Sequence, residues 1–509
     1  MTSTLSLLCD ALLRAVPSSG AHVRGQAVVG RLVLDSRHVA PGDLFAAVPG
    51  AAADGHEHAA AAVEAGASAL LVQRWLDLPV PQLRVARVRA TLGSLSAELQ
   101  AHPAGALTLV GVTGTNGKTT VSLLLHGALL AAGRAAGVVG TLGTWRGHEH
   151  RPSPLTTPEA PDLHALLTWL RDGGTREVVL LEASSMALDQ GRLDGLRFAL
   201  AVHTGLEEEH LDFHGTMEQY WASKAALFTP GRSDAAVVRV DDPWGRRLAT
   251  QVALPLVTFG SHPDADVRLT EVRSGLTGTT VLLRGRDGPV ALDVPLLGRV
   301  NAVNATAAYL AARHLGLSRA QAQEGIAAAV APPGRHSVVV AEGSPLVVVD
   351  FAHTPAALAA LLDTGRELAA PGGRVLLVFG GRGDRDRGKR PELARVAAGA
   401  DLLVLTADTT ERESLETVLA EYRLGLLGRH VHLVVEQDRR QALRCAIDAG
   451  RPGDVVLVAG RGAEPLLTVG GRTQRFLDQQ VVQQLLGVDD LYPDLAGDRG
   501  PAARDVRGR

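Results

Sequence analysis

A chain of 509 residues is longer than one ordinary hydrophobic core supports, so the sequence predicts two to four domains. Its formal net charge of −3 gives no reason to expect nucleic acid or an anionic membrane as the main partner. Two cysteines, Cys9 and Cys445, are too few for a disulfide framework or a thiolate metal cluster, and no apolar run reaches the roughly 18 residues of a membrane span. With no basic leader before the first apolar stretch, these features favour a cytoplasmic protein without membrane insertion.

In chain order, three blocks of alternating strands and helices follow one another. Residues 1–105 combine short strand-like runs with an Ala-rich helical stretch, and residues 106–330 alternate buried strands with helical segments. Residues 331–490 contain four units in which an apolar strand ends in glycine or polar residues, whereas residues 491–509 are expected to be a disordered tail. This alternation predicts an α/β protein with mostly parallel sheets.

The stretch "GVTGTNGKTT", residues 111–120, connects an apolar strand to an amphipathic helix. It departs from the common phosphate-loop spacing, because Val112 stands where a glycine is usual. A glycine turn with an exposed lysine is the alternative. The strand–loop–helix order favours nucleotide binding, in which Lys118 would reach the β and γ phosphates and Thr119 could ligate Mg²⁺. The predicted ATP-binding residues of this loop are Gly114, Thr115, Asn116, Gly117, Lys118, Thr119 and Thr120.

The octapeptide "TGTNGKTT" resembles the ATP loop of the Mur ligases and of their relatives, the folylpolyglutamate synthases. Further stretches are similar, in order, to motifs of the Mur ligases that add a diamino acid to UDP-N-acetylmuramoyl-L-alanyl-D-glutamate. They include "LDSRHVAPGDLF", "HLDFHGTMEQYWASKAALF", "GGRGDRDRGKR" and "VAGRGAE", and the resemblance covers about residues 30 to 480. The folate enzymes do not explain the N-terminal "LDSR…PGDLF" block and are therefore the second interpretation.

The resemblance implies the three-domain Mur ligase architecture. An N-terminal UDP-sugar-binding domain would comprise residues 1–105, a central P-loop ATPase domain residues 106–330, and a C-terminal Rossmann-like, amino-acid-binding domain residues 331–490. It also implies a monomeric, ATP-dependent ligase that forms an amide bond in peptidoglycan precursor synthesis through an acyl phosphate. Because an unactivated carboxylate does not accept an amine, such catalysis needs a cation-rich pocket around ATP and the carboxylate.

Four residues form the predicted catalytic and metal-binding centre together with Lys118. Glu182 ends one apolar strand and His210 begins "HLDFHG", and an acid and an imidazole at such loop positions could bind a second Mg²⁺. The resemblance implies that Lys224 is carbamylated and that its new carboxylate lies beside the metal ions. Burial near cations would lower the pKa of the Lys224 amine and favour its reaction with CO₂. The predicted metal set is thus Thr119, Glu182, His210 and Lys224.

The remaining ligand contacts follow from the resemblance alone. The further ATP contacts that it implies are Asn301, Asn304, Arg335 and Asp350. The implied contacts to the UDP-muramoyl dipeptide are Leu34, Ser36, Thr156, Thr157, Ser184, Gln190 and Arg192. The implied contacts to the amino acid are Arg385, Asp408, Thr409, Glu411, Gly460 and Glu464.

Two stretches depart from the family pattern. Where the family usually has Asn-Leu-Ser-Arg-Asp before "HLD", this chain has three acids, Glu207, Glu208 and Glu209, and a solvated loop is favoured over a metal site for them. Arg461 and Ala463 replace the usual Lys and His of the "VAGRGAE" stretch, which puts the precision of that site in doubt. A non-catalytic, nucleotide-binding paralogue is therefore a further alternative.

The added amino acid is predicted from a third departure. Family members that use meso-diaminopimelate carry Asp-Asn-Pro-Arg where this chain has "DTTE", so that Glu411 replaces the arginine that pairs with the distal carboxylate. A distal ammonium would suit this charge better than a carboxylate, which favours L-lysine or L-ornithine. A shift of register by one residue would bring Arg412 to the position of that arginine, and meso-diaminopimelate therefore remains the alternative substrate.

Overall fold

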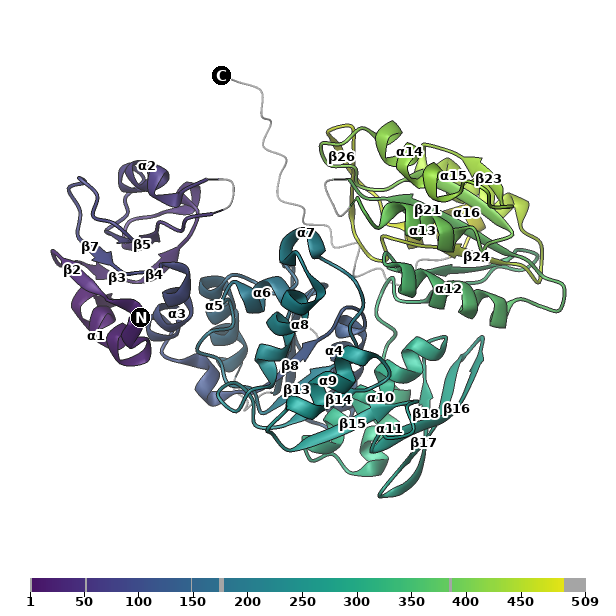
Figure 1. The fold of residues 1–509 in the computed structure, drawn as a ribbon, viewed down its shortest axis with the longest axis horizontal. Coiled ribbons are helices and arrows are strands. Elements are labelled where there is room, and N and C mark those ends of the chain that lie inside the picture. Colours follow the sequence, from purple (N-terminus) through teal and green to yellow (C-terminus); the bar gives the residue numbers. More distant parts are fainter. Residues whose placement is uncertain (1, 51–52, 148, 174–177, 384–386, 489–509) are drawn as a thin grey trace. The chain divides into compact units, whose positions relative to one another are not determined.

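The computed structural model describes residues 2–50, 53–147, 149–173, 178–383 and 387–488 (Figure 1). Arg385 and the predicted tail, residues 491–509, lie outside the described residues. The chain divides into two compact units. The first comprises residues 1–271, 281–293 and 303–330, and the second comprises residues 272–280, 294–302 and the chain from Ala331 onward. The domain boundaries after residues 105 and 330 stay predictions.

The N-terminal part of the first unit contains a five-stranded sheet. Its order is β2-β7-β6-β5-β4, and only the β2–β7 pair is antiparallel. Alternate side chains of β5 point to opposite faces, so Leu44 packs with α1 and α3 whereas Phe45 packs with α2. Strands β1 and β3 of the same part of the chain form a separate two-stranded antiparallel ribbon. The bounds are β1 Ser3–Thr4, α1 Leu5–Ala15, β2 His22–Arg24, β3 Val28–Val29, β4 Arg31–Val33, β5 Asp43–Ala46, α2 Ala59–Glu64, β6 Ala69–Val72, β7 Gln82–Arg84 and α3 Leu92–Leu99.

The central sheet has eleven strands in the order β11-β10-β9-β12-β8-β13-β14-β15-β16-β17-β18. Strands β9, β12, β8, β13, β14 and β15 are parallel, and β10 and β11 form an antiparallel edge. The strands are β8 Thr108–Thr113, β9 Ala136–Gly140, β10 Gly143–Arg146, β11 Glu149–Arg151, β12 Val178–Glu182, β13 Leu200–His203, β14 Ala236–Arg239, β15 Leu256–Gly260, β16 Val267–Gly275, β17 Gly278–Gly285 and β18 Gly288–Val294. The helices are α4 Lys118–Ala131, α5 Ala160–Arg171, α6 Ser185–Asp189, α7 Leu211–His214, α8 Met217–Ala225, α9 Pro243–Gln251, α10 Arg299–His314 and α11 Arg319–Ala327.

The register of the three middle strands brings their carboxyl ends to one edge. Val112 of β8 pairs with Glu182 of β12 and with Val202 of β13, and Thr113 pairs with His203. The apolar run of each strand is buried on both faces, as expected of a parallel sheet covered by helices. The loop after β8 therefore begins beside the carboxylate that ends β12, at the edge where ligands of such sheets bind.

The second unit contains a six-stranded sheet of order β19-β20-β24-β21-β22-β23, parallel except for β19. Helices α12, α13 and α14 pack on one face, and α15 and α16 pack on the other (Figure 1). Asp350, Arg382, Asp408 and Gly460 follow four neighbouring strands and thus share one edge of the sheet. The bounds are β19 Ser337–Val339, β20 Leu346–Val349, α12 Pro355–Leu368, β21 Val375–Gly381, α13 Arg390–Ala397, β22 Leu402–Ala407, α14 Leu415–Gly425, β23 His432–Val435, α15 Arg439–Ala449, β24 Val455–Val458, β25 Leu466–Val469, β26 Arg472–Arg475 and α16 Asp478–Leu486.

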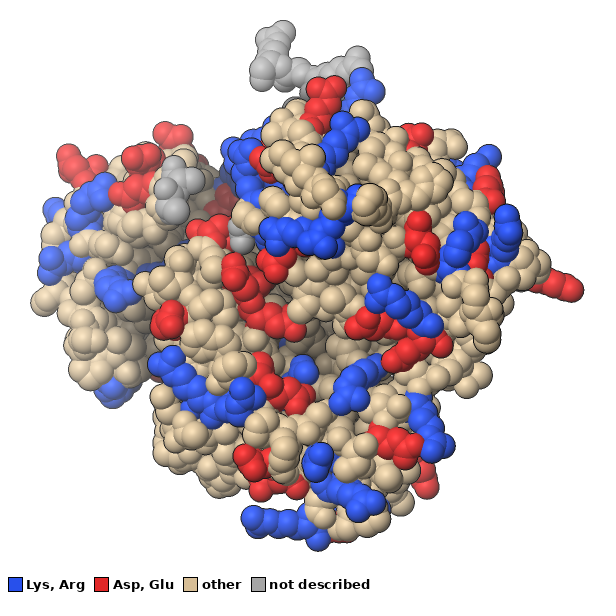
Figure 2. Space-filling model, turned by 45° about the vertical axis from the view of Figure 1, so that its right-hand side comes forward, with Lys and Arg blue, Asp and Glu red and all other residues tan. Residues whose placement is uncertain are grey.

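The surface carries charges of both signs. On the face drawn in Figure 2, basic and acidic side chains are interspersed, in keeping with the formal net charge of −3. None of the described helices combines the length and apolar character needed to cross a bilayer.

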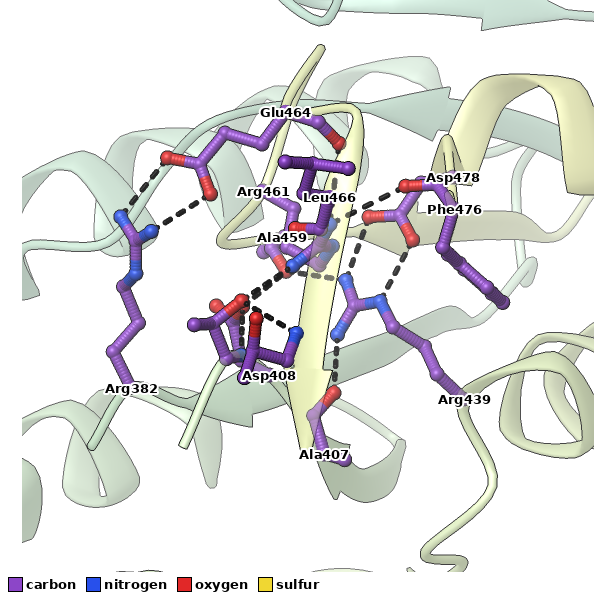
Figure 3. A network of polar contacts seen from close by, with 12 residues as sticks. Arg382, Ala407, Asp408, Arg439, Ala459, Arg461, Glu464, Leu466, Phe476 and Asp478 are labelled. Carbon is purple, nitrogen blue, oxygen red and sulfur yellow. Dashed lines mark hydrogen bonds and ion pairs between the residues drawn. The ribbon is translucent and has the colours of Figure 1, made fainter. Parts of the chain in front are cut away.

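A fully buried ion pair joins the first residues of α15 and α16. Both Arg439 and Asp478 have side chains that are 0% exposed, and the guanidinium donates to the two carboxylate oxygens at 2.7 Å each. Arg439 also donates to the carbonyls of Ala407, which ends β22, and Ala459, which follows β24 (Figure 3). The pair thus fixes two helices to the strand ends from which the loops of this sheet edge emerge.

Arg439→Ala is expected to lower the free energy of unfolding of the second unit by about 3–5 kcal/mol, because it leaves the Asp478 carboxylate buried without its partner. Arg440→Ala is the matched control, since the neighbouring arginine contacts only Gln484 in an exposed position. Its expected effect is within about 1 kcal/mol. Urea denaturation of both variants and of the unchanged protein measures the difference. Equal losses for the two variants would contradict the importance of the buried pair.

Candidate functional site

The loop between β8 and α4 has the shape of an anion cradle. Gly114 and Gly117 adopt φ angles of 143° and 88°, which side-chain-bearing residues rarely do. A Cβ on Gly114 would lie 2.0 Å from Oγ1 of Thr204, and one on Gly117 would lie 2.3 Å from Oδ1 of Asn304. The backbone of the loop therefore stays bare at the N-terminus of a 14-residue helix, where N–H groups and the helix dipole attract anions.

Two lysines converge on one carbonyl oxygen of this loop. Lys118 donates to the carbonyls of Gly114 and Thr115 at 2.9 Å each, and Lys224 of α8 donates to the same Gly114 carbonyl at 2.9 Å. Lys224 is 2% exposed. Burial, together with the nearby Lys118 charge, holds the pKa of Lys224 well below its ordinary value, although Glu209 opposes this shift. Lys224 is thus a buried amine beside the phosphate cradle, in surroundings that favour loss of its proton.

Glu182 contacts the start of α4, which follows the loop, through Thr119. It ends β12, is 1% exposed, and accepts from Oγ1 of Thr119 at 3.0 Å and from the backbone N and Oγ1 of Thr141 at 3.1 and 2.9 Å. A Cβ on Gly140 would lie 2.1 Å from Oε1 of Glu182, so only glycine leaves room for the carboxylate. Two members of the predicted metal set, Thr119 and Glu182, are therefore in direct contact, and hydroxyl and carboxylate oxygens are donors that suit Mg²⁺.

His210 and Lys224 both contact the ring of Tyr220. The His210 ring centroid is 6.3 Å from that of Tyr220, and Nζ of Lys224 lies 4.8 Å from the same Tyr220 ring. The Tyr220 hydroxyl is 3.0 Å from Oγ1 of Thr115 in the cradle. Within the described ranges, no group of three or more His, Cys, Asp and Glu side chains is arranged to hold a metal ion. Protein side chains of these types alone therefore do not complete the predicted metal site.

The three acids before His210 correct one prediction. Glu208 is exposed, as expected of a solvated loop, but Glu209 is 5% exposed and Glu207 is half-buried. Oε2 of Glu207 accepts from Nδ2 of Asn116 at 2.9 Å. The solvated-loop interpretation is thus wrong for Glu207 and Glu209, because this segment packs against the cradle. The acids at these positions were visible in the sequence, but their contact with a loop some 90 residues away was not.

The residues predicted to hold the muramoyl dipeptide gather beside Glu182. Thr157 donates to the Glu182 carbonyl at 2.6 Å and accepts from the Ser184 backbone N at 3.1 Å. Arg192 donates to the Thr157 carbonyl at 2.8 Å and to Oε1 of Gln190 at 2.7 Å. Oγ1 of Thr156 lies 3.0 Å from Oγ1 of Thr141, which itself contacts Glu182. All five predicted side chains therefore belong to one hydrogen-bonded group.

A cleft of about 470 Å³ lies between the N-terminal sheet and α5. Leu34 lines it, and Ser36 begins the short turn that follows. Glu159 also lines the cleft, and its carboxylate pairs with Arg192 at 3.1 Å and with Arg89 at 3.2 Å. Glu159 links the cleft to the dipeptide group. Glu159 was not among the predicted site residues, because nothing in its local sequence, "TTPEAPDL", indicates this link.

The four further ATP contacts that the resemblance implies divide between the two units. Asn304 lies beside Gly117, in the same unit as the cradle. Asn301, Arg335 and Asp350 belong to the second unit, where the Arg335 guanidinium lies 4.4 Å from the centroid of the Phe351 ring. Asp350 accepts from the His336 backbone N and ring Nδ1, each at 2.8 Å. Burial raises the pKa of Asp350, but the His336 charge and hydrogen bonds outweigh this and hold it below its ordinary value.

The predicted amino-acid residues surround a buried arginine in the second unit (Figure 3). The Arg461 side chain is 0% exposed, and it donates to Oδ1 of Asp408 at 2.9 Å and to Oγ1 of Thr409 at 3.2 Å. It also donates to the carbonyls of three residues of the following segment, Glu464, Leu466 and Phe476. Arg461 therefore fixes the loop that begins at Gly460 to the end of β22.

A second arginine, Arg382, forms an ion pair with Glu464. Arg382, which follows β21, donates from both terminal nitrogens to the two Glu464 oxygens at 2.9 Å each (Figure 3). Glu411 is exposed and adopts a positive φ of 50°. The structure thus brings Asp408, Thr409, Gly460 and Glu464 together, and it places Glu411 at the exposed end of the same β22 loop.

Comparison with known proteins gives consistent results over most of the chain. Residues 29–98 match the model described as Mur ligase family, catalytic domain, residues 112–312 match the Mur ligase middle domain, and residues 334–462 match the Mur ligase, glutamate ligase domain. The chain is 40% identical over 496 residues to a UDP-N-acetylmuramoyl-L-alanyl-D-glutamate–2,6-diaminopimelate ligase of Streptomyces coelicolor, covering 95% of this chain and 96% of the relative. A ligase of the same name from Xanthomonas campestris pv. campestris is 40% identical, with 90% and 94% covered.

Solved structures agree with these relatives. A UDP-N-acetylmuramoyl-L-alanyl-D-glutamate–2,6-diaminopimelate ligase superposes with a TM-score of 0.63 at 30% identity, covering 90% of this chain and 95% of the other. The MurF ligase of Thermotoga maritima, solved in complex with ADP, has the same fold, with a TM-score of 0.62 at 21% identity and 90% and 96% covered. With the cradle, the two lysines and the three-domain α/β architecture, these matches lead to one conclusion: the chain belongs to the Mur ligase family of ATP-dependent amide ligases.

Proposed function

We propose that this ligase adds L-lysine or L-ornithine to UDP-N-acetylmuramoyl-L-alanyl-D-glutamate. The observation that supports a ligase site here is that Glu182 contacts both Thr119 of the ATP cradle and Thr157 of the predicted dipeptide group, while Lys224 donates to Gly114 of the same cradle. ATP and the carboxylate to be activated would meet at this edge of the central sheet. A cytoplasmic location and a monomeric state are part of the same proposal.

The reaction has two steps. A carboxylate oxygen of the dipeptide forms a bond to the γ-phosphorus of ATP, and the bond from that phosphorus to the ADP oxygen breaks. The substrate amine then bonds to the carbonyl carbon of the acyl phosphate, inorganic phosphate leaves and the amine loses a proton. Lys118, released from the Gly114 and Thr115 carbonyls, would neutralise the transferred phosphoryl group. The bare backbone of the cradle would orient it.

Mg²⁺ would supply charge neutralisation at the phosphates. The hydroxyl of Thr119 and the carboxylate of Glu182 fit one such ion, since both are oxygen donors and lie 3.0 Å apart. His210 and a carbamylated Lys224 would hold the second. A neutral amine is the form that reacts with CO₂, and the lowered pKa of Lys224 favours that form. Carbamate formation joins the Nζ nitrogen to the CO₂ carbon with loss of one proton.

The other substrate contacts are proposed on the same basis. The UDP group would lie along Leu34 and Ser36, and the dipeptide would contact the group of five side chains beside Glu182. ATP would reach Asn304 from the cradle. Asn301, Arg335 and Asp350 remain proposed ATP contacts, and Arg385 remains a proposed contact of the amino acid's α-carboxylate.

The charge pattern of the second unit favours a diamine over a second carboxylate. Arg461 is paired with Asp408 and Arg382 with Glu464, so these guanidinium groups already have carboxylate partners. Glu411 replaces the arginine of the family motif and adds negative charge at the exposed end. Because the relatives are named as 2,6-diaminopimelate ligases, meso-diaminopimelate is the second candidate; it would require Arg382 to leave Glu464 or Arg412 to turn inward.

The amino-acid prediction is tested by measuring kcat/KM for L-lysine, L-ornithine and meso-diaminopimelate in parallel. At least one monocarboxylic diamine is expected to exceed meso-diaminopimelate about tenfold or more, since an unpaired carboxylate in such a pocket costs on the order of 1–3 kcal/mol. Glu411→Arg should shift this ratio towards meso-diaminopimelate. Glu342→Arg is the matched control, because this exposed residue precedes β20, at the opposite edge of the sheet. A higher kcat/KM for meso-diaminopimelate than for both diamines would refute the prediction.

Lys224→Ala is expected to reduce ligation to below about 1% of the unchanged rate, because it removes both the amine and its carbamate. Acetate or propionate should restore part of the activity by supplying a carboxylate in the space that the shorter side chain leaves. Lys224→Arg is the control, since its longer side chain fills that space and cannot form a carbamate. Phosphate release at increasing carboxylate concentration measures the rescue. Full activity of Lys224→Ala without added carboxylate would rule out the proposed role.

Gly140→Ala is expected to lower kcat at least about tenfold, because the added Cβ would displace the Glu182 carboxylate from Thr119. Gly105→Ala serves as the control, since no heavy atom lies within 4 Å of the Cβ position there. Titration of phosphate release with Mg²⁺ should also show a higher half-saturating concentration for Gly140→Ala. An unchanged Mg²⁺ dependence would show that Glu182 does not hold the ion.

A further inference from the structure

A segment of the chain from Thr204 to Glu207 clasps the ATP cradle. The Thr115 backbone N donates to the Gly205 carbonyl at 2.9 Å. Oγ1 of Thr115 donates to the Glu207 carbonyl at 3.1 Å and accepts from the Glu207 backbone N at 2.9 Å. Oγ1 of Thr204 donates to the Asn116 carbonyl. The Glu207 carboxylate completes the set by accepting from the Asn116 side chain at 2.9 Å.

The cradle depends on these contacts because of its own glycines. Thr115 and Asn116 stand between Gly114 and Gly117, and glycine restricts the backbone less than any other residue. The conformation of the two middle residues is therefore set by what they touch. The Asn116 side-chain amide donates to Glu207, and the Asn116 backbone carbonyl accepts from Thr204, so these two contacts hold both the side chain and the backbone of Asn116 in place.

A carboxylate so close to a phosphate site requires a counter-charge. Burial raises the pKa of Glu207, and Arg239 of β14 and the Asn116 hydrogen bond lower it, whereas Asp242 and Glu209 add to the increase. The Arg239 guanidinium is close to this segment, donating to the Thr204 carbonyl at 3.3 Å. A Cβ on Gly205, whose φ is 119°, would lie 3.2 Å from NH1 of Arg239. Gly205 and Glu207 both replace other residues of the family pattern; a side chain at Gly205 would approach Arg239 closely, and the charge of Arg239 offsets part of the negative charge of Glu207.

We propose that Glu207 is a positioning residue for ATP in this ligase. By accepting from the Asn116 side chain, it holds the cradle in the shape that binds the phosphates before ATP arrives, so that binding does not have to order the loop. This inference rests on the proposed role of residues 114–119 as the ATP cradle. Glu207, which departs from the family sequence, would thus contribute to nucleotide affinity and not to the chemical step.

The test compares Glu207→Ala, Glu207→Gln and Glu208→Ala in the full-length protein. Glu207→Ala should raise KM for ATP, and Kd for a non-hydrolysable ATP analogue, about fivefold to tenfold. KM for the UDP-muramoyl dipeptide and for the diamino acid should stay within about twofold. Glu207→Gln keeps an oxygen that accepts from Asn116 and should restore the ATP values to within about twofold. Glu208→Ala is the matched control, because this neighbouring acid is exposed.

Three results would overturn the inference. The first is an ATP KM of Glu207→Ala equal to that of Glu208→Ala. The second is a rise in all three KM values together, which indicates a general structural role. The third is a Glu207→Gln variant as impaired as Glu207→Ala. Lys118→Ala separates this inference from the proposed function: if that variant keeps full turnover, the cradle does not serve ATP, whereas loss of turnover combined with any of the three results removes only the role of Glu207.

Discussion

The carbonyl oxygen of Gly114 is the point on which the candidate site depends. Lys118 and Lys224 both donate to it, and two ammonium groups that share one acceptor in a buried position repel each other. The pKa of Lys224 is lowered, first by its burial and then by the nearby charge of Lys118. The fold produces this arrangement, because α8 places Lys224 against the Gly114 carbonyl of the loop that joins β8 to α4. A lysine on a helix, ordinarily a solvated charge, is thereby held where the neutral form of its amine is favoured.

Much of this arrangement could be predicted from local sequence. The strands within "LTLVGV", "REVVLLE" and "DAAVVRV" are continuous apolar runs, and each forms a buried parallel strand. The glycines of "TGTNGKTT" adopt the positive φ angles that such a loop requires. The contact of Thr119 with Glu182 depends on the strand order as well, because Thr119 lies in the first turn of α4, after β8, and Glu182 ends the adjacent parallel strand β12. Local pattern predicted both residues as members of the metal set, but not their contact.

Other contacts could not be predicted because they join segments that are far apart in the chain. Glu207 meets Asn116 across 91 residues, and Arg382 meets Glu464 across 82. An acid in a loop has no local sign of whether it faces water or an amide, so the composition of "LEEEHLD" indicated solvent where the structure shows burial for Glu209. Glu159 is similar: its role between the cleft and Arg192 depends on how α5 packs against the N-terminal sheet.

The loop after β24 depends on the planar shape of one guanidinium group. A guanidinium presents N–H donors on separate nitrogens in a fixed plane, whereas an ammonium has three around one nitrogen. The two terminal nitrogens of Arg461 serve one carboxylate, one hydroxyl and three carbonyls at once. Lysine at this position, despite its equal charge, would leave some of these buried oxygens without donors. Exchange of the two residues here would therefore require compensating changes in the surrounding segment.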